Sequence, residues 1–129
     1  MTPQQEVVTA DAPTPKFTYS QGRWAGDFLY TAGFGPHHPG SGEVVGTTVE
    51  EQTEQALLNV RAVLQAAGAD MSRVVKVTVH LENLAADFSG FEKAYRQFFS
   101  HPFPVRTTVG SRLPGILVEV DVVAYIAAQ

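Results

Sequence analysis

Residues 101–125, HPFPVRTTVGSRLPGILVEVDVVAY, predict two β-strands joined by a tight turn. The segments 105–111 and 116–125 are rich in Val, Thr and Ile, which favour strands. Between them, Arg112-Leu113-Pro114-Gly115 contains the Pro-Gly pair that is typical of turns. The pattern therefore predicts a hairpin, with the two segments as neighbouring strands.

Two charged side chains interrupt these apolar strands. The alternation of side chains places Arg106 and Thr108 on one face of the first strand, and Glu119 and Asp121 on one face of the second. Whether Arg106 and Glu119 share a face depends on the pairing register, which the sequence leaves open. A structural ion pair is one interpretation of these residues, although burying such a pair often only breaks even with apolar packing.

The alternative interpretation is a functional site. The planar fork of an arginine binds a carboxylate through two hydrogen bonds. A half-buried glutamate can accept and return a proton near neutral pH, especially where burial raises its pKa. Arg106 and Glu119 together therefore suit a small carboxylate substrate that reacts with water.

Two helices are predicted between these strands and the N-terminus. The first covers residues 48–67, where apolar residues recur at helical spacing after two overlapping capping-box candidates, Thr47 with Glu50 and Thr48 with Glu51. Gly68 follows as the expected C-terminal cap. The second helix covers residues 85–100, and one side of it carries the aromatic residues Phe88, Phe91, Tyr95, Phe98 and Phe99, with Asp87 as its expected N-cap.

The remaining strands complete an α+β pattern. Residues 17–33 predict two short strands around a turn at 25–27, and residues 34–48 predict a Gly/Pro loop. Residues 73–83 alternate strictly, so Val75, Val77, Val79 and Leu81 are expected on one face, opposite Lys76, Thr78 and His80. The expected fold is a mixed sheet with two helices packed on one face. We expect a single domain over residues 1–129, in which residues 1–15 form an N-terminal arm or a short edge strand.

Composition excludes several classes of function. The net charge is −4 and there is no basic cluster, which disfavours nucleic-acid binding. The chain has no cysteine and no apolar run long enough to span a bilayer, so we expect a cytoplasmic protein without membrane contact. His37 and His38 lie in a Gly/Pro loop without a third ligand at useful spacing, so no metal site is expected. His80 is interpreted as a residue that packs at an interface.

Several stretches resemble one family. They are TYSQG, GDFLYTAG, SGEVVG, EQTEQALLNVRAVLQAAGADMSRVVKVTVHLEN, DFSGFEKAYRQFF and FPVRTTVGSRLPGILVEVDVVAY. In order and spacing they are similar, from about Phe17 to Ala124, to the reactive intermediate deaminases (RidA, also called YjgF or endoribonuclease L-PSP). The resemblance implies a fold like that of the trimeric chorismate mutases, closed into a barrel-like homotrimer with sites between subunits.

The resemblance also implies an activity that needs no cofactor, namely hydrolysis of enamines and imines such as 2-aminoacrylate to 2-oxo acids and ammonia. Arg106 matches the family position that binds the substrate carboxylate, and Glu119 matches the position that orients the attacking water. Tyr19 and Thr108 match two further positions of the cleft. The partners implied are a small carboxylate substrate and two further copies of the chain.

Three positions depart from the family pattern. The usual Thr-Ser-Gly-Gln of the cleft wall is Thr31-Ala32-Gly33-Phe34 here, and a common Asn of the second helix is Glu92. Gly33, Phe34 and Glu92 are expected to bind the substrate. With Arg106 and two carboxylates, the site is expected to take a larger enamine, an aminomuconate-like deamination substrate or a substrate with its own cationic group. Two alternatives stay open, a trimer that binds small carboxylates without catalysis and a chaperone-like or regulatory trimer. A ribonuclease is disfavoured by the acidity of the chain.

Overall fold

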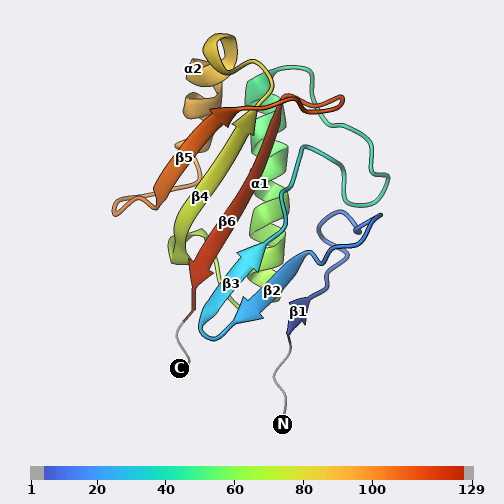
Figure 1. Cartoon of the computed structure of the whole chain (residues 1–129), viewed down its shortest axis with the longest axis vertical. Helices are drawn as coiled ribbons and strands as arrows, with labels where there is room; N and C mark the ends of the chain where they lie inside the picture. Colours follow the sequence, from blue (N-terminus) through green and yellow to red (C-terminus); the bar gives the residue numbers. More distant parts are fainter. Residues whose placement is uncertain (1–4, 127–129) are drawn as a thin grey trace.

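A computed structural model describes residues 5–126 and shows one six-stranded sheet with two helices on one of its faces (Figure 1). The elements are β1 (Glu6–Val7), β2 (Gly22–Ala25), β3 (Phe28–Thr31), α1 (Val49–Ala66), the short 3₁₀ helix η1 (Met71–Arg73), β4 (Val74–Leu81), α2 (Leu84–Tyr95), β5 (Val105–Gly110) and β6 (Val118–Tyr125). The strand order is β1-β2-β3-β6-β4-β5, in which only β4 and β5 pair in parallel. The predicted α+β class with a mixed sheet is confirmed.

The predicted hairpin of residues 105–125 is wrong, because β4 lies between β5 and β6. The helix α2 carries the chain from β4 across to β5, which gives the parallel pair that such a crossover favours. β6 then returns on the other side of β4, in antiparallel pairing. Every second residue of β6 is buried, as a central strand requires, whereas no residue of β5 is buried at the sheet edge.

The helix α1 begins as predicted. Thr48 is its N-cap, and the backbone N–H of Glu51 donates to the Thr48 hydroxyl at 3.2 Å. The Glu51 carboxylate accepts in return from the backbone of Thr47 and Thr48, and these bonds lower the pKa of Glu51. Of the two overlapping capping boxes, the one that begins at Thr48 is therefore formed. Gly68 follows the helix with a φ of 85°, as expected of a C-terminal cap.

The substitution Thr48→Ala removes this cap. We expect it to lower the free energy of unfolding by about 1 kcal/mol, because the first turn loses an acceptor for its free N–H groups. Chemical denaturation of both proteins at one concentration measures the difference. Thr47→Ala is the matched control, since Thr47 contributes its backbone N–H to the box. Equal stability of wild type and Thr48→Ala would contradict the assignment.

Two details of β4 and α2 differ from the predictions. A bulge between Val74 and Lys76 turns Val75 to solvent, so that Val77, Val79 and Leu81 are buried without it. α2 begins at Leu84, with Asn83 as its N-cap, rather than after Asp87, and it ends at Tyr95 rather than near 100. Asp87 instead lies in the first turn, where its N–H donates to the Asn83 carbonyl.

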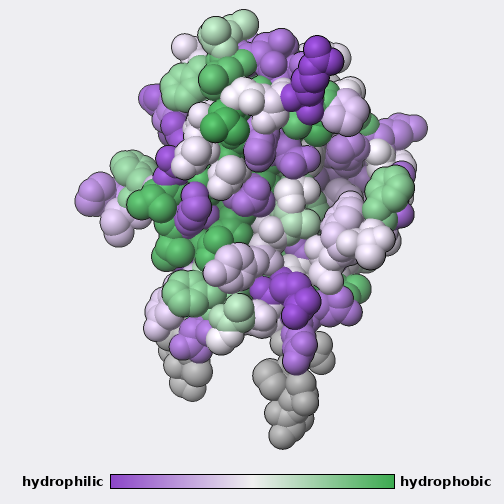
Figure 2. Space-filling model, viewed as in Figure 1, coloured by the Kyte–Doolittle hydropathy of each residue, from purple (hydrophilic) through white to green (hydrophobic). Residues whose placement is uncertain are grey.

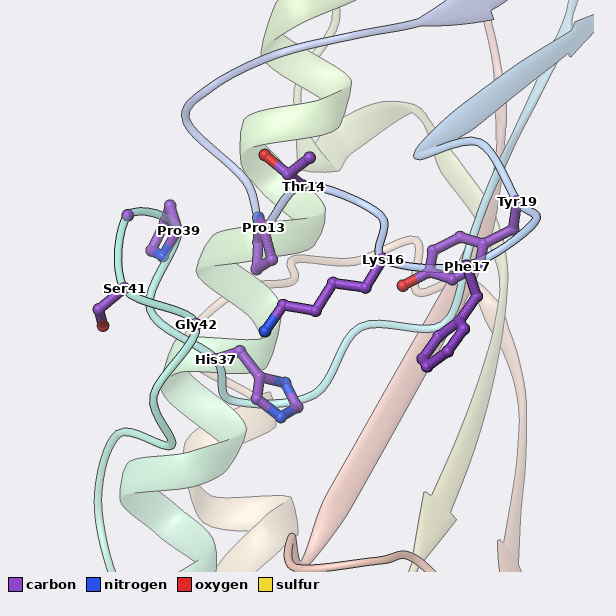
Figure 3. A pocket seen from close by; sticks show the side chains of 10 residues that line it. Pro13, Thr14, Lys16, Phe17, Tyr19, His37, Pro39, Ser41 and Gly42 are labelled. Atoms are coloured by element: carbon purple, nitrogen blue, oxygen red, sulfur yellow. The ribbon is translucent and has the colours of Figure 1, made fainter.

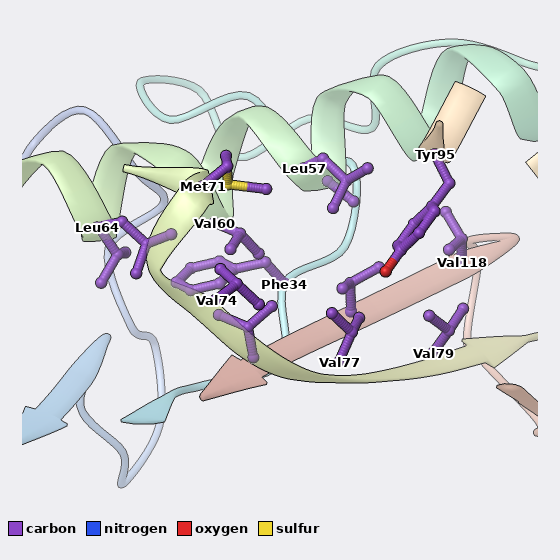
Figure 4. Close-up of a cluster of buried hydrophobic side chains, with 14 of the residues drawn as sticks. Phe34, Leu57, Val60, Leu64, Met71, Val74, Val77, Val79, Tyr95 and Val118 are labelled. Carbon is purple, nitrogen blue, oxygen red and sulfur yellow. The ribbon is translucent and has the colours of Figure 1, made fainter. Parts of the chain in front are cut away.

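The core fills the space between the sheet and the helices (Figure 4). α1 contributes Leu57, Val60 and Leu64, which are fully buried. Phe34 enters the same core at 5% exposure, and its backbone exchanges two hydrogen bonds with Val120 of β6. The segment after β3 therefore runs beside β6 at the level of Phe34, which brings Gly33 next to that strand.

The opposite face of the sheet carries no helix. Figure 2 looks onto this face and shows apolar side chains over the area of β4 and β5. Large apolar residues are exposed on the strands, and they include Phe28, Tyr30, Val75, Val105, Val109 and Tyr125. Exposed apolar surface of this kind is typical of surfaces that contact another protein.

Candidate functional site

Arg106 lies on the edge strand β5 and points to the helix-covered side of the sheet. It is the register partner of Val77, whose side chain is fully buried beneath the helices. Three rings of α2 surround the guanidinium, with centroid distances of 4.5 Å for Tyr95, 5.3 Å for Phe91 and 5.8 Å for Phe88. The rings fix the plane of the guanidinium by cation–π contact. Arg106 remains 21% exposed in its side chain, so its free N–H groups can reach a ligand.

Glu92 of α2 is the ionic partner of Arg106. Its Oε1 lies 2.9 Å from Arg106 Nη1. This Oε1 is buried and has no partner of hydrogen-bond geometry among the described residues, so the contact is ionic rather than directional. The other oxygen, Oε2, lies 3.9 Å from Nη2 of Arg96, whose side chain is 64% exposed. The carboxylate of Glu92 therefore stands between two arginines.

A pocket of about 530 Å³ opens beside this pair. Its walls are Glu92, Tyr95, Arg96, Phe99, Phe103, Pro104 and Arg106. Tyr95 stacks on Phe99 with ring centroids 4.6 Å apart, and burial raises the pKa of Tyr95 above its ordinary value. The pocket thus combines a carboxylate-binding group with aromatic walls. Thr108 lies two residues beyond Arg106 on the same face of β5, half-buried.

The sequence did not single out the aromatic walls of this pocket as part of a site. Tyr95 and Arg96 follow Glu92 by three and four residues, the spacing that places side chains on one face of a helix. This helical spacing was the pattern in the sequence that could have placed Tyr95 and Arg96 beside Glu92. Phe103 reaches the pocket from the segment between α2 and β5, and no pattern in the sequence indicated it.

Glu119 lies on the other face of the sheet. It is the register partner of His80, and both alternate with the buried residues Val79 and Val120. The Glu119 side chain lies against the backbone of Gly33, where an added Cβ would come within 2.5 Å of Oε2. Glycine at position 33 is therefore what lets this carboxylate lie close to the chain after β3. The structure thus brings Glu119 and Gly33 together.

Arg106 and Glu119 cannot act on one small molecule within a single chain. Arg106 points to the helix side of β5, while Glu119 points to the open side of β6, and β4 separates the two strands. The register that the sequence left open thus places these charges on opposite faces. Within residues 5–126 they form no ion pair with each other.

Tyr19 and Phe34 do not line the pocket beside Arg106. Tyr19, 52% exposed, lines a second pocket of about 350 Å³ between the N-terminal segment and the loop after β3. Figure 3 shows Lys16 reaching across this pocket toward the loop that carries Pro39 and Gly42. The Phe34 side chain is buried in the core and its backbone N–H and carbonyl pair with Val120, so a contact of Phe34 with substrate stays a prediction.

The open face around Glu119 carries further polar groups. His80 Nδ1 lies 2.7 Å from the hydroxyl of Ser111, the residue directly after β5. Asp121 lies two residues beyond Glu119, and burial raises its pKa, an effect that the charges of His80 and Lys76 partly oppose. His80 therefore has a hydrogen-bond partner within the chain, and its packing at an interface stays a prediction.

The raised pKa of Asp121 predicts a pH effect on stability. The folded chain keeps this proton to higher pH than the unfolded chain, whose Asp pKa is about 3.9, so Asp121 costs stability as pH rises through that window. We therefore expect Asp121→Asn to raise the free energy of unfolding at neutral pH and to flatten its dependence on pH above about 4. Denaturation across a pH series measures both. A variant less stable than wild type at neutral pH would contradict this account.

Two negative findings apply to the described part of the chain. No helix in it is long and apolar enough to cross a membrane. No group of three His, Cys, Asp or Glu side chains within residues 5–126 is arranged to hold a metal ion.

The fold and the two charged groups define a small α+β protein with an arginine-lined pocket at a sheet edge. The family model described as Endoribonuclease L-PSP matches residues 9–126, and the chain belongs to this family. It is 40% identical to the RutC family protein PH0854 of Pyrococcus horikoshii, over 95% of this chain and 98% of that protein. It is 36% identical to a 2-iminobutanoate/2-iminopropanoate deaminase of Dermatophagoides farinae, over 85% of each.

A solved structure adds a ligand to the comparison. E. coli TdcF with bound serine superimposes with a TM-score of 0.89 at 32% identity, covering 96% of this chain and 100% of that one. The family assignment made from the sequence is therefore confirmed, and the family includes imine deaminases.

Proposed function

We propose that this protein hydrolyses small enamine or imine carboxylates to 2-oxo acids and ammonia, without a cofactor. The observation that carries the proposal is Arg106, a guanidinium held by aromatic rings at the wall of a pocket and still open to a carboxylate. Relatives that are named 2-iminobutanoate/2-iminopropanoate deaminases support the reaction. The serine bound to TdcF supports a small carboxylate as the ligand.

The active site is shared between protomers. Because Arg106 and Glu119 lie on opposite faces of one sheet, a substrate that touches both must lie between two chains. The exposed apolar residues of the open face supply a surface on which a neighbouring copy can pack. Because β5 is an edge strand, Arg106 of one protomer can reach the Glu119 face of the next protomer. A closed ring of three protomers then contains three such contacts.

The reaction then follows from the two groups. An enamine first takes a proton on carbon to become the imine. Arg106 binds the carboxylate of the substrate and offsets its charge while water adds to the imine carbon. Glu119 accepts a proton from that water and returns it to the nitrogen, which gives a carbinolamine. Glu119 then moves the hydroxyl proton to this nitrogen, the C–N bond breaks, ammonia leaves, and the oxygen becomes the carbonyl of the 2-oxo acid.

Three further residues support these roles. Thr108 presents a hydroxyl on the same face as Arg106 and can donate to the substrate carboxylate. Gly33 leaves room for the Glu119 carboxylate beside the backbone, because a Cβ at this position would come within 2.5 Å of Oε2. Tyr19 matches a cleft position of the family and is half-exposed in this chain, so it can contact a substrate held between protomers.

A carboxylate-binding trimer without catalysis is the second candidate function. Ala32 and Phe34 favour it, because they replace a hydroxyl and a carboxamide that the family pattern places on the cleft wall. Both candidate functions predict binding of a small carboxylate, but only the deaminase predicts faster hydrolysis of the imine.

An assay of the wild-type protein separates them. A dehydratase acting on serine or threonine generates the enamine in place, and the release of 2-oxo acid is followed with and without the protein. We expect acceleration over the uncatalysed rate. Binding of a small carboxylate without any acceleration would favour the second candidate.

A further inference from the structure

The pocket beside Arg106 carries a carboxylate that a simple carboxylate-binding site does not need. Oε1 of Glu92 is buried against Arg106, so Oε2 is the oxygen left to face the pocket. Glu92 is held in this position by α2, the same helix that supplies the rings around Arg106. The carboxylate is thus a fixed part of the wall.

This arrangement lowers the affinity for a substrate whose only charge is its carboxylate. Arg106 has five N–H donors, and Glu92 occupies one nitrogen, so a substrate binds beside Glu92 rather than in its place. Two carboxylates then share one guanidinium, and like charges at this separation repel. A positive group on the substrate, placed next to Glu92, removes that repulsion.

The rest of the pocket favours such a positive group. Its volume of about 530 Å³ exceeds what a three-carbon imine fills, so a longer side chain fits. Tyr95, Phe99 and Phe103 line the space, and the faces of aromatic rings attract cations. Arg96 is the opposing charge, but it is exposed and 3.9 Å from Glu92, so water screens it.

We propose, on the basis of the function proposed above, that Glu92 selects the substrate. The pocket takes imine or enamine carboxylates whose side chain ends in a cation, such as a guanidinium or an ammonium group. Arg106 binds the carboxylate, while Glu92 and the aromatic rings bind the cationic end.

Two substrates of equal shape test this selection. An amino-acid oxidase generates the imine of arginine or of citrulline, which has a neutral urea in place of the guanidinium, and loss of each imine is followed in competition with semicarbazide. We expect wild type to favour the arginine-derived imine in kcat/KM. We expect Glu92→Gln, which keeps an oxygen beside Arg106, to lower that preference about tenfold. Glu54→Gln, an exposed carboxylate on α1, is the control and should leave the preference unchanged.

Calorimetry with arginine and citrulline gives a second readout that does not require turnover, and the thermal unfolding of each variant verifies its folding. Acceleration of both imines with no preference, or with a preference that Glu92→Gln leaves intact, would overturn the selection by Glu92 and leave the proposed function standing. Acceleration of neither imine, nor of the small enamine, would overturn the proposed function and this inference with it.

Discussion

Replacement of Arg106 by alanine is expected to abolish the acceleration of imine hydrolysis, with a loss of about 100-fold or more in kcat/KM. The guanidinium is the group that holds the substrate carboxylate, and a charge-assisted pair of hydrogen bonds of this kind contributes roughly 3 kcal/mol or more. Arg106→Lys keeps the charge but loses the fork, so we expect it to retain only a small part of the activity. The imine assay and the affinity for a small carboxylate are the measurements.

The stability of Arg106→Ala needs its own control, because the variant leaves the buried oxygen of Glu92 without its ionic partner. Glu92→Gln combined with Arg106→Ala removes that orphaned charge and should restore stability without restoring activity. Arg23→Ala, an exposed arginine on β2, should behave as wild type. Retention of carboxylate affinity in a folded Arg106→Ala protein would show that the anion binds elsewhere.

Replacement of Glu119 by glutamine is expected to lower kcat by roughly 100-fold or more, because an amide cannot take a proton from the attacking water. The affinity for a small carboxylate should change little, since Arg106 supplies that interaction. Glutamine has nearly the same shape, so its fit against Gly33 is kept. A split between kcat and binding therefore distinguishes a proton-transfer role from a structural one.

Asp121→Asn is the matched control for Glu119→Gln, since both carboxylates lie on the same face of β6. We expect the control to keep full activity at neutral pH. If Glu119→Gln retained kcat while Asp121→Asn lost it, the proton-transfer role would belong to Asp121.

Much of the fold could be predicted from local patterns in the sequence. The capping box at Thr48 and the apolar spacing that follows it defined α1 to within a residue or two. Alternation defined β4 and β6, although the bulge at Val75 left no mark on the pattern. The pairing of β5 with β4 was missed because a short turn with Pro-Gly favours a hairpin locally, and only the packing of α2 decides otherwise.

Long-range contacts were beyond the reach of these patterns. Asn59 of α1 donates to the carbonyls of Gly35 and His37, and so fixes the loop after β3 on the helix. Gln52 accepts from the backbone of Leu117, 65 residues away. In the sequence, a buried Asn or Gln looks like any other polar residue of a helix. Its hydrogen-bond partners are backbone groups far away in the chain, so only the folded structure identifies them.

The sequence suggested candidate residues for the site but could not predict their arrangement. The identities of Arg106 and Glu119 suggested their chemistry, whereas their opposite faces depend on the strand order. The ion pair with Glu92 depends in turn on how α2 crosses β5. The Phe34 side chain lies in the core because the segment after β3 pairs with β6 at Val120, and this pairing is a long-range contact.

The central claim is that each active site joins Arg106 of one protomer to Glu119 of another. Co-expression of Arg106→Ala and Glu119→Ala, with different tags so that mixed assemblies can be purified, tests it most directly. Either variant alone has no complete site. In every mixed trimer, whichever variant contributes two chains, one interface in three, or about a third, pairs an intact Arg106 with an intact Glu119. We predict that mixed assemblies regain roughly that fraction of wild-type activity, and mixed assemblies as inactive as their parents would contradict the claim.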